Sequence, residues 1–139
     1  MSAEQIRVLV MFAVREEAKH FQPPPGIQCK VVVSGIGKRN AERAILSLLE
    51  TFKPAFVLTC GYAGGLSADP AHGTIAYDAD EGSQLAPMLI KLGAKPVKYF
   101  CSDRIAVTRE EKRTLRTQSG ADAVEMESGV IRALCRDRR

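Results

Sequence analysis

The sequence lacks tryptophan, has only two histidines, and contains four cysteines that lie far apart. These cysteines form no Cys-x-x-Cys pair and have no histidine-rich spacing around them, so they indicate neither a metal site nor a disulfide framework. We expect them to be small, buried, hydrophobic residues of a protein from a reducing compartment. They are Cys29, Cys60, Cys101 and Cys135.

Long hydrophobic runs are also missing. The apolar stretch at residues 6–14 is too short to cross a bilayer as a helix. Glu4 and Arg7 stand at its start, where a secretory signal would carry a different pattern. The sequence therefore predicts no membrane partner and a cytoplasmic location.

Neither sign of charge dominates the chain. It has 20 lysines and arginines against 16 aspartates and glutamates, for a formal net charge of +4. The densest basic run comprises Arg132, Arg136, Arg138 and Arg139. We interpret this run as the solvated end of a helix, where cations interact favourably with the helix dipole. A nucleic-acid patch is the alternative, but no aromatic residues interleave with the basic ones, so we expect no nucleic-acid partner.

The 139 residues have the length of one domain, and no linker or repeat divides them, so we expect a single domain over 1–139. Apolar runs of strand length alternate with stretches of helical periodicity, which predicts a three-layer α/β domain. Thr108 and Glu111 are spaced to cap one of the helices. The runs at 6–14 and 55–60 are expected to be buried strands. The other expected strands cover 27–33, 73–77, 96–101, 105–107 and 121–124, and the expected helices cover 15–21, 41–52, 84–92, 109–118 and 126–137.

Three segments place acidic residues or glycines directly after an expected strand. In open α/β sheets, ligands bind beyond the carboxyl ends of the strands, so these segments could meet in one glycine-lined hollow faced by carboxylates. Carboxylates can hold sugar hydroxyls or activate a water molecule. Taken singly, each segment also fits an ordinary turn or a solvated helix start. The segments are Glu16-Glu17, the turn Gly61–Gly65, and Glu125-Met126-Glu127.

A glycine-containing turn, Ser34-Gly35-Ile36-Gly37-Lys38, follows the second expected strand. A dinucleotide-binding fingerprint would need a third glycine at the next position of its spacing, and none follows. The turn therefore gives little support to a dinucleotide site.

The motifs are more specific together than singly. The chain contains VVVSGIGKRNAERAI and FVLTCGYAGGLSADPAHGTIAYD, then RIAVTREEKRTLR and DAVEMESGVIRALC. With the opening VLVMFAVREEAKHF, these segments resemble, in the same order, the methylthioadenosine/S-adenosylhomocysteine nucleosidases and the related purine nucleoside phosphorylases. The resemblance spans nearly the whole chain. It implies a three-layer αβα sandwich with a mixed, mainly parallel sheet, a homodimer or higher homo-oligomer, and no metal or organic cofactor.

The resemblance implies that the chain cleaves the N-glycosidic bond of a purine nucleoside, and it assigns roles to the acidic segments. Glu17 matches the glutamate that helps to activate the attacking water. Glu127 matches the glutamate that holds the ribose hydroxyls. Met126 would pack against the sugar, and Glu125 is included in the same substrate-binding motif.

Other positions match the family at the base and the ribose. Ala63 and Gly64 correspond to backbone positions beside these two groups. Ile105 stands where the family usually has an aromatic residue that stacks on the purine. Tyr62 replaces a small serine, which predicts a narrower or differently polar hollow.

The opening motif favours hydrolysis over phosphorolysis. Related phosphorylases usually have a phosphate-binding turn with glycine and arginine after the first strand, where this chain has AVREEA. Arg15 leaves phosphorolysis, with phosphate as co-substrate, as an alternative. Both reactions pass through an oxocarbenium-like sugar whose positive charge carboxylates stabilise. A non-catalytic nucleoside-binding or oligomerisation module is a further alternative.

One part of the family pattern has no match. The family has an aspartate that protonates the departing base at a strand exit beyond the VEME motif, followed by a final helix. The sequence ends at Arg139 before such a segment, and Asp137 lies in a basic helix end. We therefore expect a chain that is truncated relative to the family at its C-terminus. We also expect slow base release by these 139 residues, because losing a general acid costs about 10²–10⁴-fold in rate.

Overall fold

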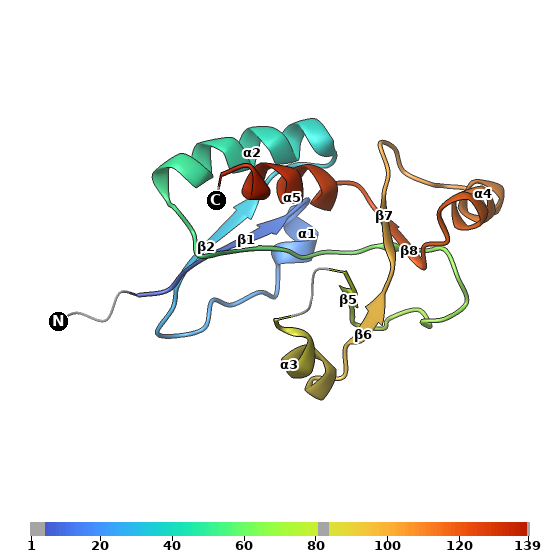
Figure 1. The fold of residues 1–139 in the computed structure, drawn as a ribbon, viewed down its shortest axis with the longest axis horizontal. Coiled ribbons are helices and arrows are strands. Elements are labelled where there is room, and N and C mark those ends of the chain that lie inside the picture. The colour runs from blue at the N-terminus through green and yellow to red at the C-terminus, as the bar shows by residue number, and fades with distance from the viewer. Residues whose placement is uncertain (1–4, 81–83, 139) are drawn as a thin grey trace. The chain divides into compact units, whose positions relative to one another are not determined.

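The computed structural model describes residues 5–80 and 84–138 (Figure 1). These residues belong to two compact units. Unit 1 is formed by residues 1–62 and 126–139, and unit 2 by residues 63–125. Arg139, the last member of the basic run, lies outside the described residues.

Unit 1 contains a three-stranded parallel sheet. Its strands are β1 (Arg7–Phe12), β2 (Gln28–Val33) and β3 (Phe56–Thr59), in the order β2-β1-β3. The four residues from Leu9 to Phe12 in the central strand are each at most 5% exposed. A strand in the middle of a covered parallel sheet is apolar on both faces, which explains this continuous run. The prediction of a buried first strand is confirmed.

Two helices and the sheet of unit 1 share one core. The helices are α2 (Lys38–Thr51) and α5 (Ser128–Arg136), which lie side by side (Figure 1). Leu9 and Met11 point to the same face of β1 because they are two residues apart. They pack with apolar side chains of both helices, and the buried residues of this cluster are Leu9, Met11, Ala41, Ile45 and Ile131. The apolar stripe predicted for the helix at 41–52 is therefore confirmed.

The first helix is shorter than predicted. α1 covers Arg15–Ala18, whereas the sequence predicted residues 15–21. The Phe21 N–H donates to the Ala18 carbonyl oxygen at 3.0 Å, so the chain leaves the helix in a turn. The Phe21 ring then lies 5.7 Å from the Phe12 ring, centroid to centroid.

Two predictions about burial are wrong. β3 was expected to be buried, but it is an edge strand among the described residues, and Phe56 is 43% exposed. The cysteines were expected to be buried, but Cys60 and Cys101 are exposed, and the other two are half-buried. Cys60 follows the edge strand β3, and Cys29 lies in the opposite edge strand β2, so neither is covered on all sides.

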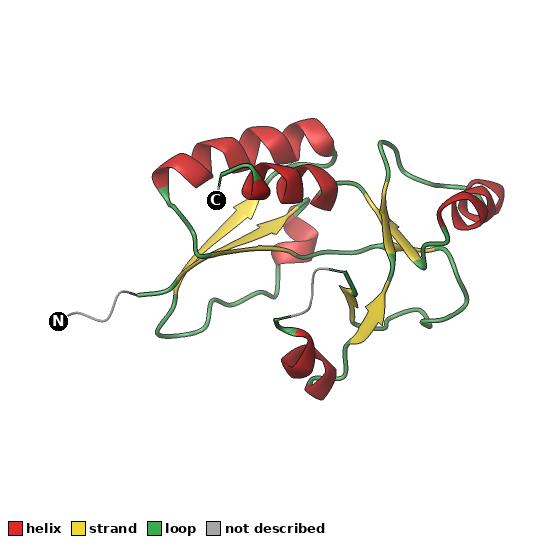
Figure 2. Ribbon diagram, viewed as in Figure 1, coloured by secondary structure: helices red, strands yellow, loops and turns green. Residues whose placement is uncertain are grey.

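The described residues of unit 2 form short strands and two helices (Figure 2). β4 (Gly64–Gly65), β8 (Ala123–Glu125) and β7 (Tyr99–Cys101) form one sheet in that order, with β8 antiparallel to β4 and parallel to β7. β5 (Ala76–Asp78) and β6 (Lys95–Val97) form a parallel pair. The helices are α3 (Ala86–Lys91), with a proline in its first turn as predicted, and α4 (Arg109–Ser119). Across the described residues most strand pairs are parallel, which confirms the α/β class with a mixed, mainly parallel pairing.

The predicted strand at 96–101 and the predicted turn at 61–65 need correction. The run 96–101 is divided between β6 and β7, which belong to different sheets. Lys98 separates them, since its N–H donates to Asp122 Oδ2 at 3.0 Å. The predicted turn 61–65 ends in a strand, and the β-carbon of an alanine at Gly64 would lie only 3.1 Å from Val124 Cγ1. Gly64 therefore allows β4 to approach β8 closely.

The predicted strand at 105–107 is a loop, and the cap of α4 explains why. Glu111 Oε2 accepts the N–H groups of Val107 and Thr108 at 2.8 and 3.0 Å, so these donors serve the cap instead of a strand ladder. Thr108 Oγ1 in turn accepts the Glu111 N–H at 3.1 Å. The capping box predicted for this helix is thus confirmed. The Thr108 and Val107 N–H groups, with Arg104 nearby, lower the pKa of Glu111.

Asp122 joins three segments of unit 2. Its carboxylate accepts the Lys98 N–H and lies 2.9 Å from Arg116 Nη1 of α4. Ser67 Oγ lies 3.4 Å from Asp122 Oδ1. The Lys98 N–H, followed by Arg116, lowers the pKa of Asp122 below its ordinary value of 3.8.

Asp122→Asn is expected to lower the free energy of unfolding by about 1–3 kcal/mol near neutral pH, because an amide replaces a charged acceptor of several donors. A carboxyl whose pKa is lowered by folding stabilises the protein above its unfolded pKa, and this contribution is lost as the pH falls through the folded pKa. The free energies of unfolding of the two proteins, plotted against pH, should therefore converge below pH 3.8, the ordinary pKa of the Asp122 carboxyl. Urea unfolding at a series of pH values measures this. Asp103→Asn, at an exposed position in the same unit, is the control, and a constant gap between wild type and Asp122→Asn at all pH values would contradict the prediction.

Candidate functional site

The carboxyl ends of all three strands of unit 1 meet at one edge of its sheet. The Ser34 and Gly35 N–H groups, after β2, donate to the carbonyl oxygens of Phe12 and Ala13 at 2.9 and 3.0 Å. The Cys60 N–H, after β3, donates to the Met11 carbonyl oxygen at 2.9 Å. Because the strands are parallel, the segments that follow them lie together, at the edge where open α/β sheets bind ligands.

Glu17 is held at this edge by three backbone N–H groups. Its Oε2 accepts the N–H groups of Ala13 and Val14 at 2.9 and 3.2 Å. Its Oε1 accepts the N–H of Tyr62, 45 residues away in the sequence, at 2.9 Å. The first two bonds are local and cap α1, whereas the third links the exit of β1 to the exit of β3. The carboxylate is therefore fixed in position and orientation.

The two adjacent glutamates of α1 differ in their surroundings. Glu17 is half-buried, whereas Glu16 is exposed to solvent. Successive helical residues point about 100° apart, so only one of two neighbours can face the strand edge. Glu17 is the one that faces it.

A second glutamate faces the glycine turn after β2. Glu127 precedes α5, is half-buried, and accepts the Gly37 N–H on Oε1 at 2.8 Å. Gly37 has φ of +93°, a left-handed conformation that glycine adopts without strain and that turns its N–H toward the carboxylate. Glu17 and Glu127 thus both lie against backbone N–H groups of segments that follow the strands of unit 1.

Cys60 lies between β3 and the Gly61 turn, and the charge of Glu17 affects the pKa of its thiol. Although the residue as a whole is exposed, desolvation of its thiol and the nearby Glu17 carboxylate raise its pKa above the ordinary value of 9.0. A raised pKa keeps the thiol protonated and slows its reaction with electrophiles near neutral pH.

Glu17→Gln is therefore expected to speed alkylation of Cys60. Removing the negative charge lowers the pKa of the thiol, so the thiolate fraction at a given pH rises, by about 2- to 10-fold. The measurement is iodoacetamide labelling of the Cys60 peptide, followed by mass spectrometry. Glu16→Gln is the control that should leave the rate unchanged. An equal rate in both variants would contradict the proximity of Glu17 to the thiol.

The remaining predicted site residues are divided between the units. Met126 is half-buried in unit 1, next to Glu127. In unit 2, Gly64 is paired with Val124, Ala63 is exposed, and Ile105 is 60% exposed in the loop before α4. The half-buried Glu125 ends β8, and its carbonyl oxygen accepts the Ser102 N–H at 2.8 Å. The substrate contacts of these residues stay predictions.

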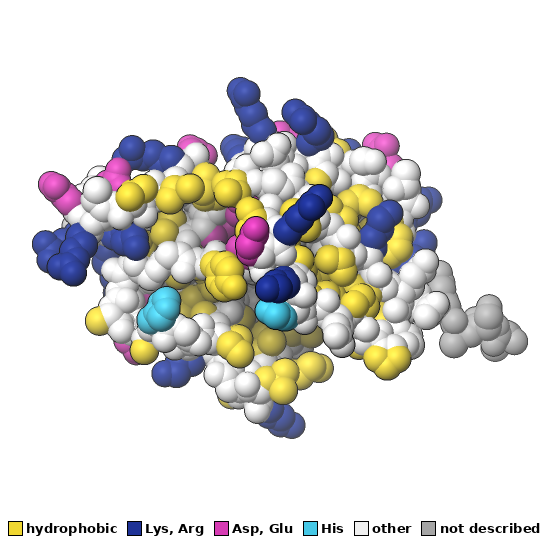
Figure 3. All heavy atoms as spheres, turned by 180° about the vertical axis from the view of Figure 1, so that it is seen from behind, with side chains coloured by type: hydrophobic (Ala, Val, Ile, Leu, Met, Phe, Trp, Pro, Cys, Tyr) yellow, Lys and Arg dark blue, Asp and Glu magenta, His cyan; other side chains and the backbone are white. Residues whose placement is uncertain are grey.

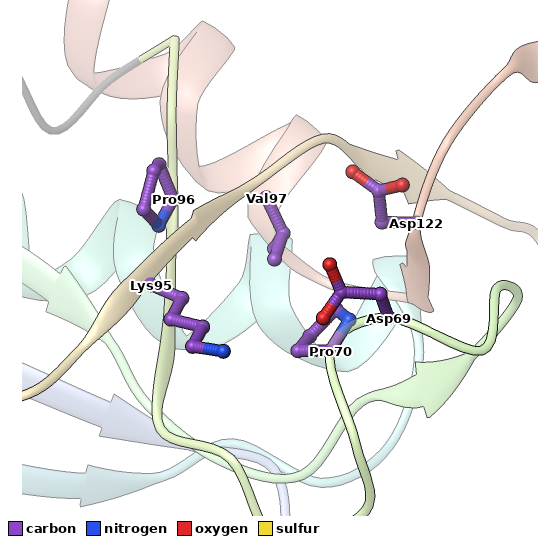
Figure 4. A pocket seen from close by; sticks show the side chains of 6 residues that line it. All are labelled: Asp69, Pro70, Lys95, Pro96, Val97 and Asp122. Carbon is purple, nitrogen blue, oxygen red and sulfur yellow. The ribbon is translucent and has the colours of Figure 1, made fainter.

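Two cavities of unit 2 are lined by residues other than the predicted site residues. One, of about 130 Å³, is lined by Asp69, Pro70, Lys95, Pro96, Val97 and Asp122 (Figure 4). The other, of about 260 Å³, lies between α4 and the loop before it. Arg104 and Ala106 line this second cavity, whereas Ile105 between them does not.

Sequence reasoning missed the residues that hold the site together. The sequence predicts Gly61 only as part of a turn and a role for Tyr62 only through its side chain, whereas the Tyr62 backbone N–H makes the contact with Glu17. Nothing in the sequence indicates that Asp122 joins three segments. The contact of Glu111 with the loop of Ile105 can be inferred from the sequence. The capping signal that predicts α4 also places the Glu111 carboxylate at the N–H groups of Val107 and Thr108.

Basic side chains and residues of the types that bind metals also lie elsewhere on the described surface. Figure 3 shows lysine and arginine side chains at several places on the surface of the described residues. Arg138 of the basic run lies 3.3 Å from Glu50 Oε1. Among the residues that the structure describes, no cluster of histidine, cysteine or acidic side chains could hold a metal ion, and no helix is both long and apolar enough for a membrane span.

Comparisons with known proteins identify the fold. No protein-family model and no curated protein sequence matches the chain. The crystal structure of 5′-methylthioadenosine/S-adenosylhomocysteine nucleosidase from Helicobacter pylori with butyl-thio-DADMe-Immucillin-A matches with a TM-score of 0.79 at 18% identity, over 97% of this chain and 81% of that one. Futalosine hydrolase of Helicobacter pylori matches with a TM-score of 0.80 at 18% identity, over 95% of this chain and 79% of that one.

A third solved structure holds a purine. The methylthioadenosine/S-adenosylhomocysteine nucleosidase from Colwellia psychrerythraea, in complex with adenine, matches with a TM-score of 0.80 at 20% identity, over 96% of this chain and 78% of that one. The chain has the fold of the methylthioadenosine/S-adenosylhomocysteine nucleosidases and of futalosine hydrolase, as its motifs imply.

Proposed function

We propose that the chain binds a purine nucleoside and cleaves its N-glycosidic bond, by hydrolysis rather than phosphorolysis. The observation that carries the proposal is the pair Glu17 and Glu127, both held by backbone N–H groups at the strand edge of unit 1. The solved structures with this fold include nucleosidases, one of them with adenine bound, which supports the choice of a purine nucleoside.

Glu17 is proposed to orient and activate the attacking water. An ionised carboxylate offers about four acceptor sites, so the three backbone N–H groups leave capacity for a water molecule. Because these N–H groups already fix the carboxylate, its orientation need not change during the reaction. Such preorganised charge also stabilises the positive charge that develops on the sugar.

Glu127 is proposed to accept hydrogen bonds from the ribose hydroxyls, with Met126 packed against the sugar. The Gly37 N–H holds Glu127 Oε1 and so fixes the direction of the acceptor. Hydrogen bonds from hydroxyls to a charged acceptor contribute about 1.5–3 kcal/mol each. Glu127 is therefore proposed to contribute affinity for the sugar, whereas Glu17 is proposed to activate the attacking water.

The family resemblance suggests Ala63, Gly64, Ile105 and Glu125 for the base side. The backbone at Ala63 and Gly64 would lie beside the base and ribose, and Glu125 would assist in binding. Ile105 would contact the purine, more weakly than an aromatic ring would because it lacks a π face. A homo-oligomeric state and a cytoplasmic location are proposed with this function. The base-protonating acid of the family has no match among these residues, so we expect slow cleavage by the 139 residues alone.

The test is base release from methylthioadenosine, adenosine and inosine, with the protein in excess and the products identified by mass spectrometry. Slow release of base and free pentose without phosphate is expected. Release that depends on phosphate and yields ribose 1-phosphate would contradict hydrolysis and indicate the phosphorylase alternative. Nucleoside binding without base release would indicate the non-catalytic module, and the absence of both would contradict the proposal.

A further inference from the structure

We propose that Gly61 is the positioning residue for Glu17: its missing side chain leaves the space that the Glu17 carboxylate occupies. A β-carbon added at position 61 would lie 2.5 Å from Oε1, 2.7 Å from Cδ and 2.8 Å from Oε2 of Glu17. Favourable contacts between such atoms begin near about 3.5 Å. A side chain at position 61 and the observed Glu17 carboxylate therefore exclude each other.

The carboxylate cannot yield without losing its anchors. A carboxylate at the end of a flexible side chain would normally move away at little cost. Here Oε1 is held by the N–H of Tyr62, the residue next to Gly61, and Oε2 by the N–H groups of Ala13 and Val14. Movement away from position 61 lengthens the Tyr62 bond first, since that N–H belongs to the same turn. Gly61 thus provides the space for the carboxylate, and the adjacent Tyr62 N–H provides a hydrogen bond to it.

Neighbouring glycines of the same motif have other surroundings. The β-carbon of an alanine at Gly65 would find its nearest atom, Ser67 O, at 4.0 Å. At Gly64 the close neighbour is Val124, which belongs to the strand paired with β4. Of these three glycines, only Gly61 makes room for a carboxylate.

The consequence for catalysis rests on the proposed function. Displacement of a reacting group by about 1 Å can cost about 10²-fold in rate. Gly61→Ala is therefore expected to lower the rate of base release at saturating nucleoside by about 10²-fold and to leave the half-saturating concentration nearly unchanged. This split is expected because Glu127, the proposed ribose ligand, is anchored by Gly37 and not by Gly61.

The experiment is a double-mutant cycle on the full chain with Gly61→Ala, Glu17→Ala and both together, and with Gly65→Ala as the matched control. Thermal unfolding and single-turnover base release are both measured. In the wild-type background, Gly61→Ala is expected to lower the Tm by about 5 °C. In the Glu17→Ala background the space is empty, so the same substitution should lower the Tm less, only by the strain of a side chain at the Gly61 φ of +157°, and should not lower the residual rate further.

The outcomes separate this inference from the proposed function. If Gly61→Ala fails to fold while the double variant folds, the steric exclusion by Glu17 is supported. An equal fall in Tm with and without Glu17, failure of both variants to fold, or a Gly61→Ala variant as stable as Gly65→Ala would overturn the inference. If the wild-type chain neither binds nor cleaves a nucleoside, the proposed function fails, and the coupling in Tm still decides whether Gly61 positions Glu17.

Discussion

Glu17→Gln is expected to slow base release from methylthioadenosine by about 10²–10⁴-fold, the usual cost of removing a general base. The substitution keeps the size of the side chain but removes its charge. It also replaces one acceptor oxygen by an NH₂ group, which cannot accept a hydrogen bond. Either the Tyr62 N–H or the pair from Ala13 and Val14 then faces a donor. The free energy of unfolding should therefore fall by about 1–3 kcal/mol as well.

Glu16→Gln is the matched control for this prediction. It makes the same chemical change at the neighbouring, exposed position of α1. Single-turnover base release and urea unfolding are measured for both variants. Equal effects of the two substitutions would contradict the assignment of Glu17, because a general loss of negative charge would then suffice to explain them.

Glu127→Gln is expected to weaken binding of a purine nucleoside by about 10- to 100-fold, because hydroxyls that donate to a charged acceptor lose about 1.5–3 kcal/mol when the charge is removed. The amide oxygen can still accept the Gly37 N–H, so the fold should be retained. Isothermal titration with methylthioadenosine measures the affinity. Glu42→Gln, at an exposed position of α2, is the control, and an unchanged affinity in Glu127→Gln would remove Glu127 from the binding site.

The sequence predicts best what depends on local patterns. The buried strand β1 follows from an uninterrupted apolar run, and α2 follows from apolar residues at helical spacing. The cap of α4 follows from Thr108 and Glu111 three residues apart. In each case the residues that decide the structure are close together in the sequence.

The failures come from contacts that local patterns do not contain. Ile105-Ala106-Val107 is apolar enough for a strand, but the Val107 N–H is taken by Glu111. Cys60 is exposed because β3 lies at the sheet edge among the described strands, a property of strand order and not of composition.

The candidate site was predicted in part for the same reason. Spacing alone identified acidic residues at strand exits, and the choice between Glu16 and Glu17 came from the family resemblance. The structure shows that a bond from Tyr62, far along the chain, distinguishes the two glutamates. The role of Gly61 could not be inferred, because it depends on the position of a carboxylate that the sequence places elsewhere.

The most direct test of the central claim, that the strand edge of unit 1 binds a purine nucleoside, is titration of the chain with methylthioadenosine in parallel with Glu127→Gln and Glu42→Gln. This measurement does not depend on how the base is protonated, because binding precedes protonation. We predict saturable binding to the wild-type chain and to Glu42→Gln, and an affinity about 10- to 100-fold weaker for Glu127→Gln. No binding by the wild-type chain, or equal binding by all three proteins, would contradict the claim.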